Sequence, residues 1–229
     1  MFFAFILPIS SVIMISDAGI NAHIANGKYP VFILFGTLSG PNDPTRVYQA
    51  GFEDASDRCH SMAKFIFAHT QMSPGLSRKY NVKPPAFGLF YQQQYIPCPK
   101  SLPQTGDAII EFLGSYLSRF VQKVNSSWVN NDRKRVIYFS KRHTIPSYVS
   151  GLVGQFSSLV DLDVGFAQLD DEIQKLFPEA HDQSLFFYNG TIGFENYQGI
   201  RNPGNVSEAL NKFFGGIGLT RSTDLPKIH

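Results

Sequence analysis

The sequence is poor in cysteine. It has two cysteines in 229 residues, Cys59 and Cys98, and no C-x-x-C pair anywhere. A dithiol redox motif is therefore excluded, because disulfide exchange needs an attacking thiolate and a resolving thiol close to it. In an oxidising compartment Cys59 and Cys98 could form a disulfide with each other. Two separate buried thiols are the alternative, since free cysteine is often found in protein cores.

The chain also lacks a strong charge of either sign. Its formal net charge is +2, with no basic stripe that alternates with aromatic residues, so we expect no nucleic-acid partner. No group of residues indicates a metal or a cofactor. The carboxylates of interest match no EF-hand loop and are typical of helix caps and solvated turns. They are Asp43, Asp161, Asp163, Asp170 and Asp171.

Long apolar runs are absent as well, except at the start. The chain is apolar up to Ile15, which is shorter than the roughly 20 residues of a membrane-spanning helix. Small residues up to Ala18 offer a cleavage site, so residues 1–18 are predicted to be a signal peptide. No Lys or Arg precedes the apolar segment, and an uncleaved membrane anchor is the alternative.

Three N-x-S/T sequons favour the secretory pathway, at Asn125, Asn189 and Asn205. Each lies in a predicted linker, turn or helix start, where a glycan would be exposed. Asn189 is expected to be the most exposed, because it precedes Gly190 in a two-residue hairpin turn. The last residues, LPKIH, are not a KDEL-type retention signal.

The composition is globular, and residue periodicity predicts an α/β order in the first half of the chain. Continuous apolar runs predict buried strands, and apolar residues at helical spacing predict helices. The predicted strands are 29–35, 63–69, 86–90 and 91–96, and the predicted helices are 45–59 and 105–124.

The segment Ser77–Phe90 (SRKYNVKPPAFGLF) carries the most specific pattern. It predicts a helix end, a tight turn and a buried strand that Pro85 opens, at a position where a sheet tolerates proline. We expect a cis bond between Pro84 and Pro85, because X–Pro bonds alone make cis inexpensive. The pattern resembles the thioredoxin fold, in which this proline faces the dithiol site.

The second half of the chain repeats the same order of elements. Its predicted strands are 136–139, 164–169, 184–188 and 192–197, and its predicted helices are 145–159, 171–177 and 206–214. The end of the repeat, SLFFYNG…FENYQG…EALNKFF, resembles a protein disulfide isomerase-type domain. The resemblance implies two tandem thioredoxin-like domains, each a mixed central sheet flanked by helices. We expect domains at 28–124 and 135–216, a linker at 125–134 and a tail at 217–229.

The dithiol positions of the resembled family hold no cysteine. In the first domain they are Asn42-Asp43-Pro44-Thr45, which begins 43 residues before Pro85. In the second domain they are Thr144-Ile145-Pro146-Ser147, and the cis-proline position falls near Gln183. Hydroxyl and amide groups cannot exchange disulfides. Asn42, Thr144 and their neighbours instead favour helix N-caps, so no catalytic residue is assigned.

The resemblance implies a redox-inactive protein disulfide isomerase-like protein of the secretory pathway, in the lumen of the endoplasmic reticulum. Such domains bind unfolded polypeptide, a partner chaperone or an oxidoreductase, and Pro85 is the residue best placed to line the binding surface. One alternative is an oxidoreductase that uses a single cysteine. Another is the thioredoxin-like portion of a larger membrane or J-domain chaperone.

Overall fold

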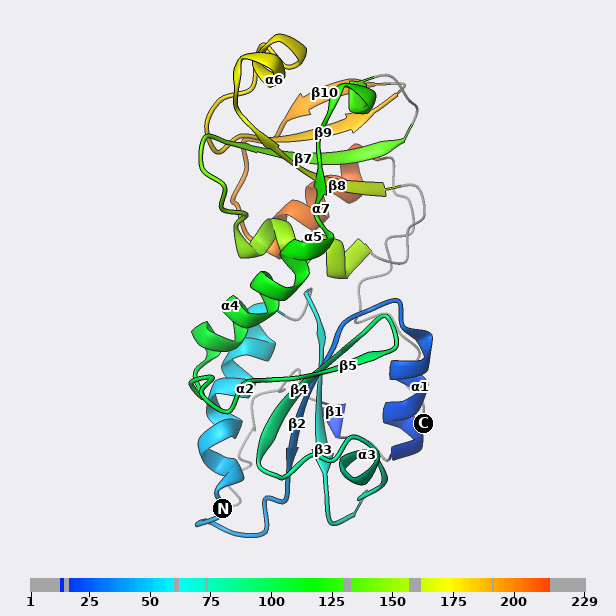
Figure 1. The fold of residues 1–229 in the computed structure, drawn as a ribbon, viewed down its shortest axis with the longest axis vertical. Helices are drawn as coiled ribbons and strands as arrows, with labels where there is room; N and C mark the ends of the chain where they lie inside the picture. Colours follow the sequence, from blue (N-terminus) through cyan, green and yellow to red (C-terminus); the bar gives the residue numbers. More distant parts are fainter. Residues whose placement is uncertain are drawn as a thin grey trace, which may run out of the picture. The chain divides into compact units, whose positions relative to one another are not determined.

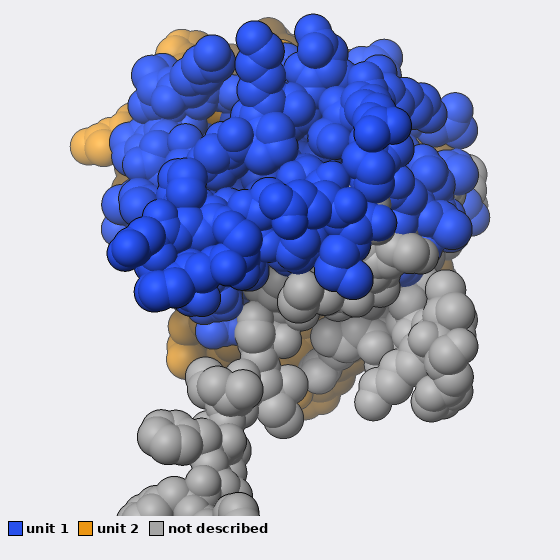
Figure 2. All heavy atoms as spheres, turned by 90° about the horizontal axis from the view of Figure 1, so that it is seen from below, with its two compact units in different colours: residues 1–111 blue, residues 112–229 orange. Residues whose placement is uncertain are grey.

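A computed structural model describes residues 13–14, 17–59, 62–72, 74–129, 133–156, 162–190 and 192–214. The chain divides into two compact units between Glu111 and Phe112, coloured separately in Figure 2. Each unit is built around one five-stranded mixed sheet. The predicted α/β class with two mixed sheets is therefore confirmed.

The first unit has the strand order β1-β3-β2-β4-β5. Strands β1 and β2 run parallel to β3, whereas β4 runs antiparallel to both of its neighbours. The strands are β1 (Ile13–Met14), β2 (Val31–Gly36), β3 (Lys64–His69), β4 (Ala86–Tyr91) and β5 (Gln94–Pro97). The helices are α1 (Asp17–Asn26), α2 (Thr45–Cys59) and α3 (Pro74–Lys79), and the boundary between the units falls within α4 (Gly106–Leu117).

The central strand β2 is buried along its whole length because helices cover both faces of the sheet (Figure 1). On one face, α1 and α3 pack onto the sheet through Ile20, Ile24 and Leu76. On the other face, Phe52 of α2 lies 6.0 Å from Phe32, measured between ring centroids. Each such side chain contributes about 1.5–3 kcal/mol on burial, so an apolar run with no alternation suits this strand.

The second unit has the strand order β10-β9-β7-β8-β6, which is the first order read from the other edge. Its strands are β6 (Gln122–Lys123), β7 (Lys134–Ser140), β8 (Leu162–Gln168), β9 (Leu185–Asn189) and β10 (Gly193–Asn196). Its helices are α5 (Ser147–Phe156), α6 (Asp171–Leu176) and α7 (Pro203–Phe213), with 3-10 turns η1 (Ser118–Phe120) and η2 (Ser126–Val129).

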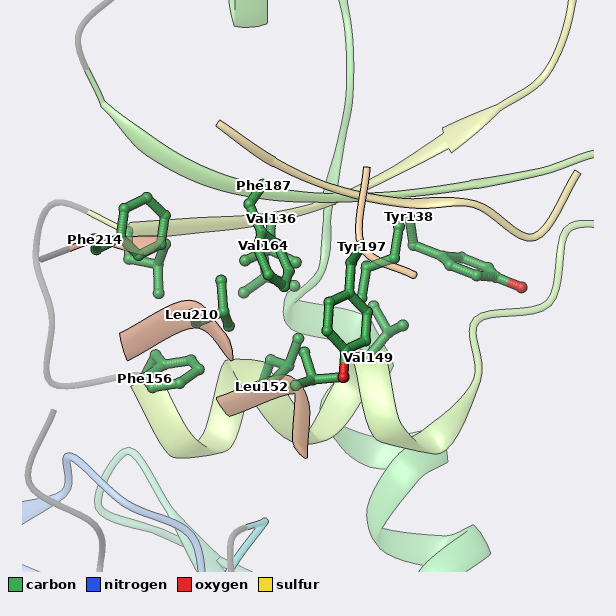
Figure 3. Packing of buried hydrophobic residues seen from close by; sticks show 13 residues of the cluster. Val136, Tyr138, Val149, Leu152, Phe156, Val164, Phe187, Tyr197, Leu210 and Phe214 are labelled. Atoms are coloured by element: carbon green, nitrogen blue, oxygen red, sulfur yellow. The ribbon is translucent and has the colours of Figure 1, made fainter. Parts of the chain in front are cut away.

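Two apolar clusters fill the second unit. One lies between the sheet and helices α5 and α7, where Val149, Leu152 and Leu210 meet strand residues (Figure 3). The other lies on the α6 side of the sheet and includes Trp128 and Ile173. Helix α6 and the pair α5 and α7 are thus on opposite faces, as Figure 1 also shows.

The expected domain limits need correction at three places. The first unit starts before residue 28, since β1 pairs with β3 and α1 contributes to the core. Strand β6, expected within the first domain, pairs with β8 of the second sheet. The expected linker at 125–134 contains η2, whose Trp128 is buried. The polar Asn and Ser residues around Trp128 hid this anchor in the sequence pattern.

The chain termini fall largely outside the described residues. Of the predicted signal peptide, the structure describes only residues 13–14 and 17–18, and the predicted cleavage point after Ala18 lies within α1. The predicted tail at 217–229 is outside the described residues. Among the helices that the structure describes, none combines the length and the apolar character that a membrane span requires.

Candidate functional site

The degenerate dithiol positions of the first unit lie at the end of the sheet where β2 stops. Phe35 pairs with Ala86, so the next residue of β2, Gly36, faces Pro85 in the same register. The peptide bond between Pro84 and Pro85 is cis, as the sequence predicts. Helix α2 begins at Thr45. A Cβ atom on Gly36 would overlap with Thr45, so this glycine allows α2 to start against the strand.

Asp43 is the centre of this site. Its side chain is 8% exposed, and its Oδ1 accepts a hydrogen bond of 2.8 Å from the Thr45 backbone N–H. Its Oδ2 accepts bonds from the Ser39 N–H at 2.7 Å, from Ser39 Oγ at 2.8 Å and from Thr37 Oγ1. The carboxylate therefore binds the loop after β2 to the first turn of α2.

These hydrogen bonds keep Asp43 ionised. They lower the pKa of its carboxyl group well below the usual value, with the Thr37 hydroxyl as the largest cause and the Ser39 and Thr45 donors next. A negative charge at a helix N-terminus is also favoured by the helix dipole. In disulfide-exchanging proteins a reactive thiolate places a negative charge at this end of the helix. Here the ionised Asp43 carboxylate supplies that charge instead.

The N-cap of α2 is Asp43 and not Asn42, although the sequence predicts both as caps. The predicted cap at Asp43 is confirmed, whereas Asn42 is exposed, and no hydrogen bond of its side chain is found among the described residues. Four donor atoms converge on the two oxygens of the Asp43 carboxylate. An asparagine side chain has only one oxygen, so it could not accept all four bonds. Thr45 is buried, and its Oγ1 accepts a bond of 3.2 Å from the Thr37 N–H.

The corresponding segment of the second unit is held less tightly. Thr144 and Ser147 are exposed, Ile145 and Pro146 are half-buried, and α5 begins at Ser147. Among the residues that the structure describes, no hydrogen bond of the Thr144 side chain is found, so the predicted N-cap at Thr144 is wrong. The first turn is closed instead by the Pro146 carbonyl, which accepts bonds from the N–H groups of Val149 and Ser150.

Gln183 stands where the first unit has Pro85. Tyr138 pairs with Leu185, so Ser140, two residues further along β7, faces Gln183. Gln183 has a φ of 62°, and the cis bond at Pro84–Pro85 has no counterpart in the described part of the second unit. The neighbouring Asp182 holds this end of the sheet: its Oδ1 accepts bonds from the Lys141 N–H at 2.7 Å and from Ser140 Oγ at 3.1 Å.

Comparison with known proteins gives similarity in structure only. No protein-family model and no curated protein matches the chain. Full-length ERdj5 is similar at a TM-score of 0.54 and 10% identity over 89% of this chain, and ERdj5 form I at 0.54 and 11% over 89%. The chain spans 32% and 30% of those two solved chains.

The chain has a tandem thioredoxin-like fold. The first two thioredoxin domains of Naumovozyma dairenensis Eps1p also match, over 92% of this chain and 97% of theirs, at 9% identity and a TM-score of 0.37. The assignment rests on the two ERdj5 structures and on the strand order of the two sheets. In both thioredoxin-like units, the dithiol position is at the end of the sheet described above.

Cys59 lies at the opposite end of α2 from this site, whereas Cys98 lies at this end of the first sheet, where its N–H donates to the Phe87 carbonyl at 3.4 Å. Both thiols are free, so the structure does not contain the disulfide considered from the sequence. Cys59 is buried near the end of α2, where its thiol donates a hydrogen bond of 2.9 Å to the Ala55 carbonyl. Burial raises the pKa of Cys59 to about 12 and that of Cys98 to about 12. At neutral pH neither thiol supplies a thiolate, which is the species that attacks sulfur.

All three sequons lie in the second unit. Asn125 is exposed, and its Oδ1 accepts bonds from the Ser127 N–H and Oγ at 3.0 and 2.6 Å. Asn205 is exposed in the first turn of α7. Asn189 is only half exposed, because it ends β9 and pairs with Gly193, so the expectation that it is the most exposed sequon is wrong.

The remaining carboxylates singled out in the sequence have structural roles. Asp170 caps α6 by accepting a bond of 2.8 Å from the Ile173 N–H, as expected. Asp163 is not a turn residue: it lies in β8 and forms a two-bond ion pair with Arg133. Asp161 lies outside the described residues. No group of His, Cys, Asp or Glu within the described ranges is arranged to hold a metal ion.

Proposed function

We propose that the protein is a redox-inactive, protein disulfide isomerase-like polypeptide-binding protein of the secretory pathway. The observation that carries this proposal is the hydrogen-bonded Asp43 carboxylate at the position where a reactive dithiol would lie. A carboxylate in this place orders the loop and the start of α2 but cannot form a mixed disulfide.

The thiols support the same conclusion. A single-cysteine oxidoreductase needs a thiol of lowered pKa in an accessible position. The pKa values of Cys59 and Cys98 are instead raised by desolvation, in a fully buried position for Cys59 and a half-buried one for Cys98. Neither lies at a helix N-terminus, since Cys59 ends α2 and Cys98 follows β5.

The proposed binding surface is the end of the first sheet around Pro85. Val47, in the first turn of α2, is 64% exposed, and Met72, in the loop after β3, is 79% exposed. Both residues are two positions along the chain from a residue that contacts Gly36. Thr45, before Val47, packs on Gly36, and the N–H of Thr70, before Met72, donates to the Gly36 carbonyl at 2.8 Å. Exposed apolar side chains beside a strand end suit an extended apolar segment.

Membership of the secretory pathway is supported by the three sequons, of which Asn125 and Asn205 are well exposed. The binding partners in this proposal are unfolded polypeptides, or a partner chaperone or oxidoreductase. No sequon lies between residues 1 and 111, so none belongs to the unit that carries the proposed surface.

The test measures client binding with matched variants. The protein is expected to suppress aggregation of a reduced, unfolded client without reducing insulin disulfides. Val47→Asp with Met72→Asp should abolish the suppression. Ile192→Asp with Ile200→Asp is the control, since these side chains of the second unit are 60% and 68% exposed. Disulfide reduction above a thiol-free blank, or equal loss in both variants, contradicts the proposal.

A further inference from the structure

The loop after β7 carries three consecutive basic side chains, Lys141, Arg142 and His143, and all three are exposed. Arg201, just before α7, is exposed as well. None of the ion pairs among the described residues involves any of these four side chains. No direct ion pair therefore occupies these four side chains within this part of the chain.

Two tyrosines connect the segments that carry these charges. Tyr138 of β7 and Tyr148 of α5 contact each other edge to face, with 6.2 Å between ring centroids. Arg201 acts electrostatically on both hydroxyl groups, and Arg142 acts on that of Tyr138. Figure 3 shows the Tyr138 hydroxyl pointing away from the labelled core residues. The loop after β7, the first turn of α5 and the residue before α7 therefore border one surface.

The carboxylate of Asp182 lies beside this surface, and its pKa is lowered by the hydrogen bond from the Lys141 N–H and further by the charges of Lys141 and Arg142. Asp182 accepts bonds from the Lys141 N–H and from Ser140 Oγ, and the Arg142 N–H donates to Ser140 Oγ at 3.0 Å. These bonds fix the backbone of the basic loop and leave its side chains free to reach a ligand. The acidic residues 170–172 follow β8 at the same end of the sheet, since the Leu169 N–H donates to the Ser140 carbonyl at 3.0 Å. They start α6, which packs on the opposite face of the sheet, and the Asp170 carboxylate accepts a hydrogen bond from the Ile173 N–H there.

The chemistry of the surface suits carboxylates. Arginine pairs with a carboxylate through two parallel hydrogen bonds, which a lysine cannot do. Burial raises the pKa of Tyr148 to about 12, so its hydroxyl keeps its proton and can donate as well. The N-terminal end of α5 adds a partial positive charge to the same region.

The first unit has no such surface at the equivalent place. Its loop after β2, residues 37–41, reads TLSGP and carries no charge, and the next acidic group, Asp43, is held by four donor atoms. The basic character is therefore a property of the second unit and not a consequence of the fold that both units share.

We propose that the surface formed by Lys141, Arg142, His143, Tyr148 and Arg201 binds an acidic polypeptide segment of a partner protein. Two arginines and a lysine match a short run of Glu or Asp side chains in number and charge. Nucleic acid fits less well, because its affinity is built from many phosphate contacts and this surface offers few cations. This interaction is independent of client binding by the first unit.

The test uses the full 229-residue chain. The probe is a fluorescein-labelled peptide of repeating Glu-Ser units, and the matched probe has Gln in place of Glu. Anisotropy titrations at low and at physiological salt should show binding of the acidic peptide only, weakened by salt. Arg142→Glu with Arg201→Glu should weaken it at least tenfold, about 1.4 kcal/mol. The milder Arg142→Gln with Arg201→Gln should weaken it in the same direction.

Arg78→Glu with Lys100→Glu is the control, since both residues are exposed cations of the first unit and the charge change is the same. It should leave the affinity unchanged. Equal weakening by both charge reversals would show that net charge alone attracts the peptide and would overturn the proposal. Equal binding of the Gln peptide, or binding of an RNA oligonucleotide or of anionic phosphatidylserine vesicles in place of the acidic peptide, would overturn it too.

Discussion

The two units share one strand order and one register, yet they cover the same face of the sheet differently. In the first unit this face is covered by α1, a helix whose Ile20 and Ile24 enter the core. In the second unit the 3-10 turn η2 takes the place of α1 in chain order, between the edge strand β6 and the central strand β7, and buries Trp128. A single large aromatic side chain thus does in one unit what a helix does in the other.

The two units also differ at the dithiol position. Both hold the loop after the central strand with a carboxylate, but the first takes it from the residue before Pro44 and the second from Asp182, next to the position of Pro85. The resulting surfaces differ in character, with exposed Val47 and Met72 in the first unit and exposed basic residues in the second. The exposed side chains at this end of the sheet therefore differ in chemistry although the fold is shared.

The largest expected effect tests the role of Trp128. Its ring lies on Gly165, where a Cβ atom would come within 2.6 Å of it, and the Arg135 guanidinium lies 4.8 Å from its centroid. Trp128→Ala should lower the free energy of unfolding by about 3–5 kcal/mol, because it leaves a cavity. Urea unfolding followed by far-UV circular dichroism measures this.

Ile24→Ala in α1 is the comparison variant for Trp128. Its side chain contributes to the same face of the first sheet, but Ile20 and the rest of the helix remain in place. Its cost should be at the low end of the range of about 2–5 kcal/mol for such truncations. If Ile24→Ala costs as much as Trp128→Ala, the single tryptophan does not take over the packing role of a helix.

A smaller effect is expected at the two loop-holding carboxylates. Asp43→Asn should lower the urea midpoint more than Asp182→Asn, because four donor atoms converge on Asp43 and two on Asp182. Hydrogen bonds lower the pKa of both groups in the folded state, so their stabilisation is present above the unfolded carboxyl pKa of about 3.9. It is lost as the pH falls below that value.

The acid limb of the stability profile measures this difference. The Asp43→Asn variant should have a flatter acid limb than the wild type, while Asp182→Asn should change the limb less. If the acid limb of Asp43→Asn is the same as that of the wild type, the ionised Asp43 carboxylate does not hold the loop after β2.

A weaker pH effect is expected at α1, with no counterpart at η2. Lys64 Nζ lies 2.9 Å from Nε2 of His23, and burial, with the Lys64 charge second, lowers the pKa of His23. The unfolded chain therefore takes up the proton first, near the ordinary pKa of about 6.5. Stability is full above this pH and declines as the pH falls through it. His23→Gln should remove this decline in urea midpoints, and an unchanged decline would exclude His23 as its source.

Much of the fold can be predicted from periodicity. The predicted helix 45–59 matches α2 residue for residue, and the apolar run at 29–35 contains most of β2. The helix predicted at 105–124 is too long, because Val121 and Val124 continue its apolar spacing although the chain tightens into η1 and then extends into β6. Two-residue strands such as β1 and β6 carry too little pattern to be recognised.

The site could be located from the sequence but not understood from it. Pro85 and the spacing to Asn42 indicate where the dithiol position lies. The role of Asp43 depends on Thr37 and Ser39, which reach it through the shape of the loop. The only hint of this role in the sequence is that a threonine, a serine and an aspartate precede the start of α2. The tertiary contact of Gly36 with Thr45 has no local sequence signal.

The smallest effect concerns two fully buried serines, Ser56 of α2 and Ser150 of α5. Ser150 Oγ donates to the Pro146 carbonyl at 3.3 Å, whereas Ser56 Oγ has no hydrogen-bond partner among the described residues. Ser56→Ala should leave the protein as stable or more stable by up to about 1 kcal/mol, because it removes a desolvated hydroxyl at no cost in hydrogen bonding. Ser150→Ala should cost about 0.5–1 kcal/mol for its lost bond. Urea unfolding of the two variants side by side gives the difference, and a Ser56→Ala variant less stable than Ser150→Ala would show that the Ser56 hydroxyl has a partner in solution.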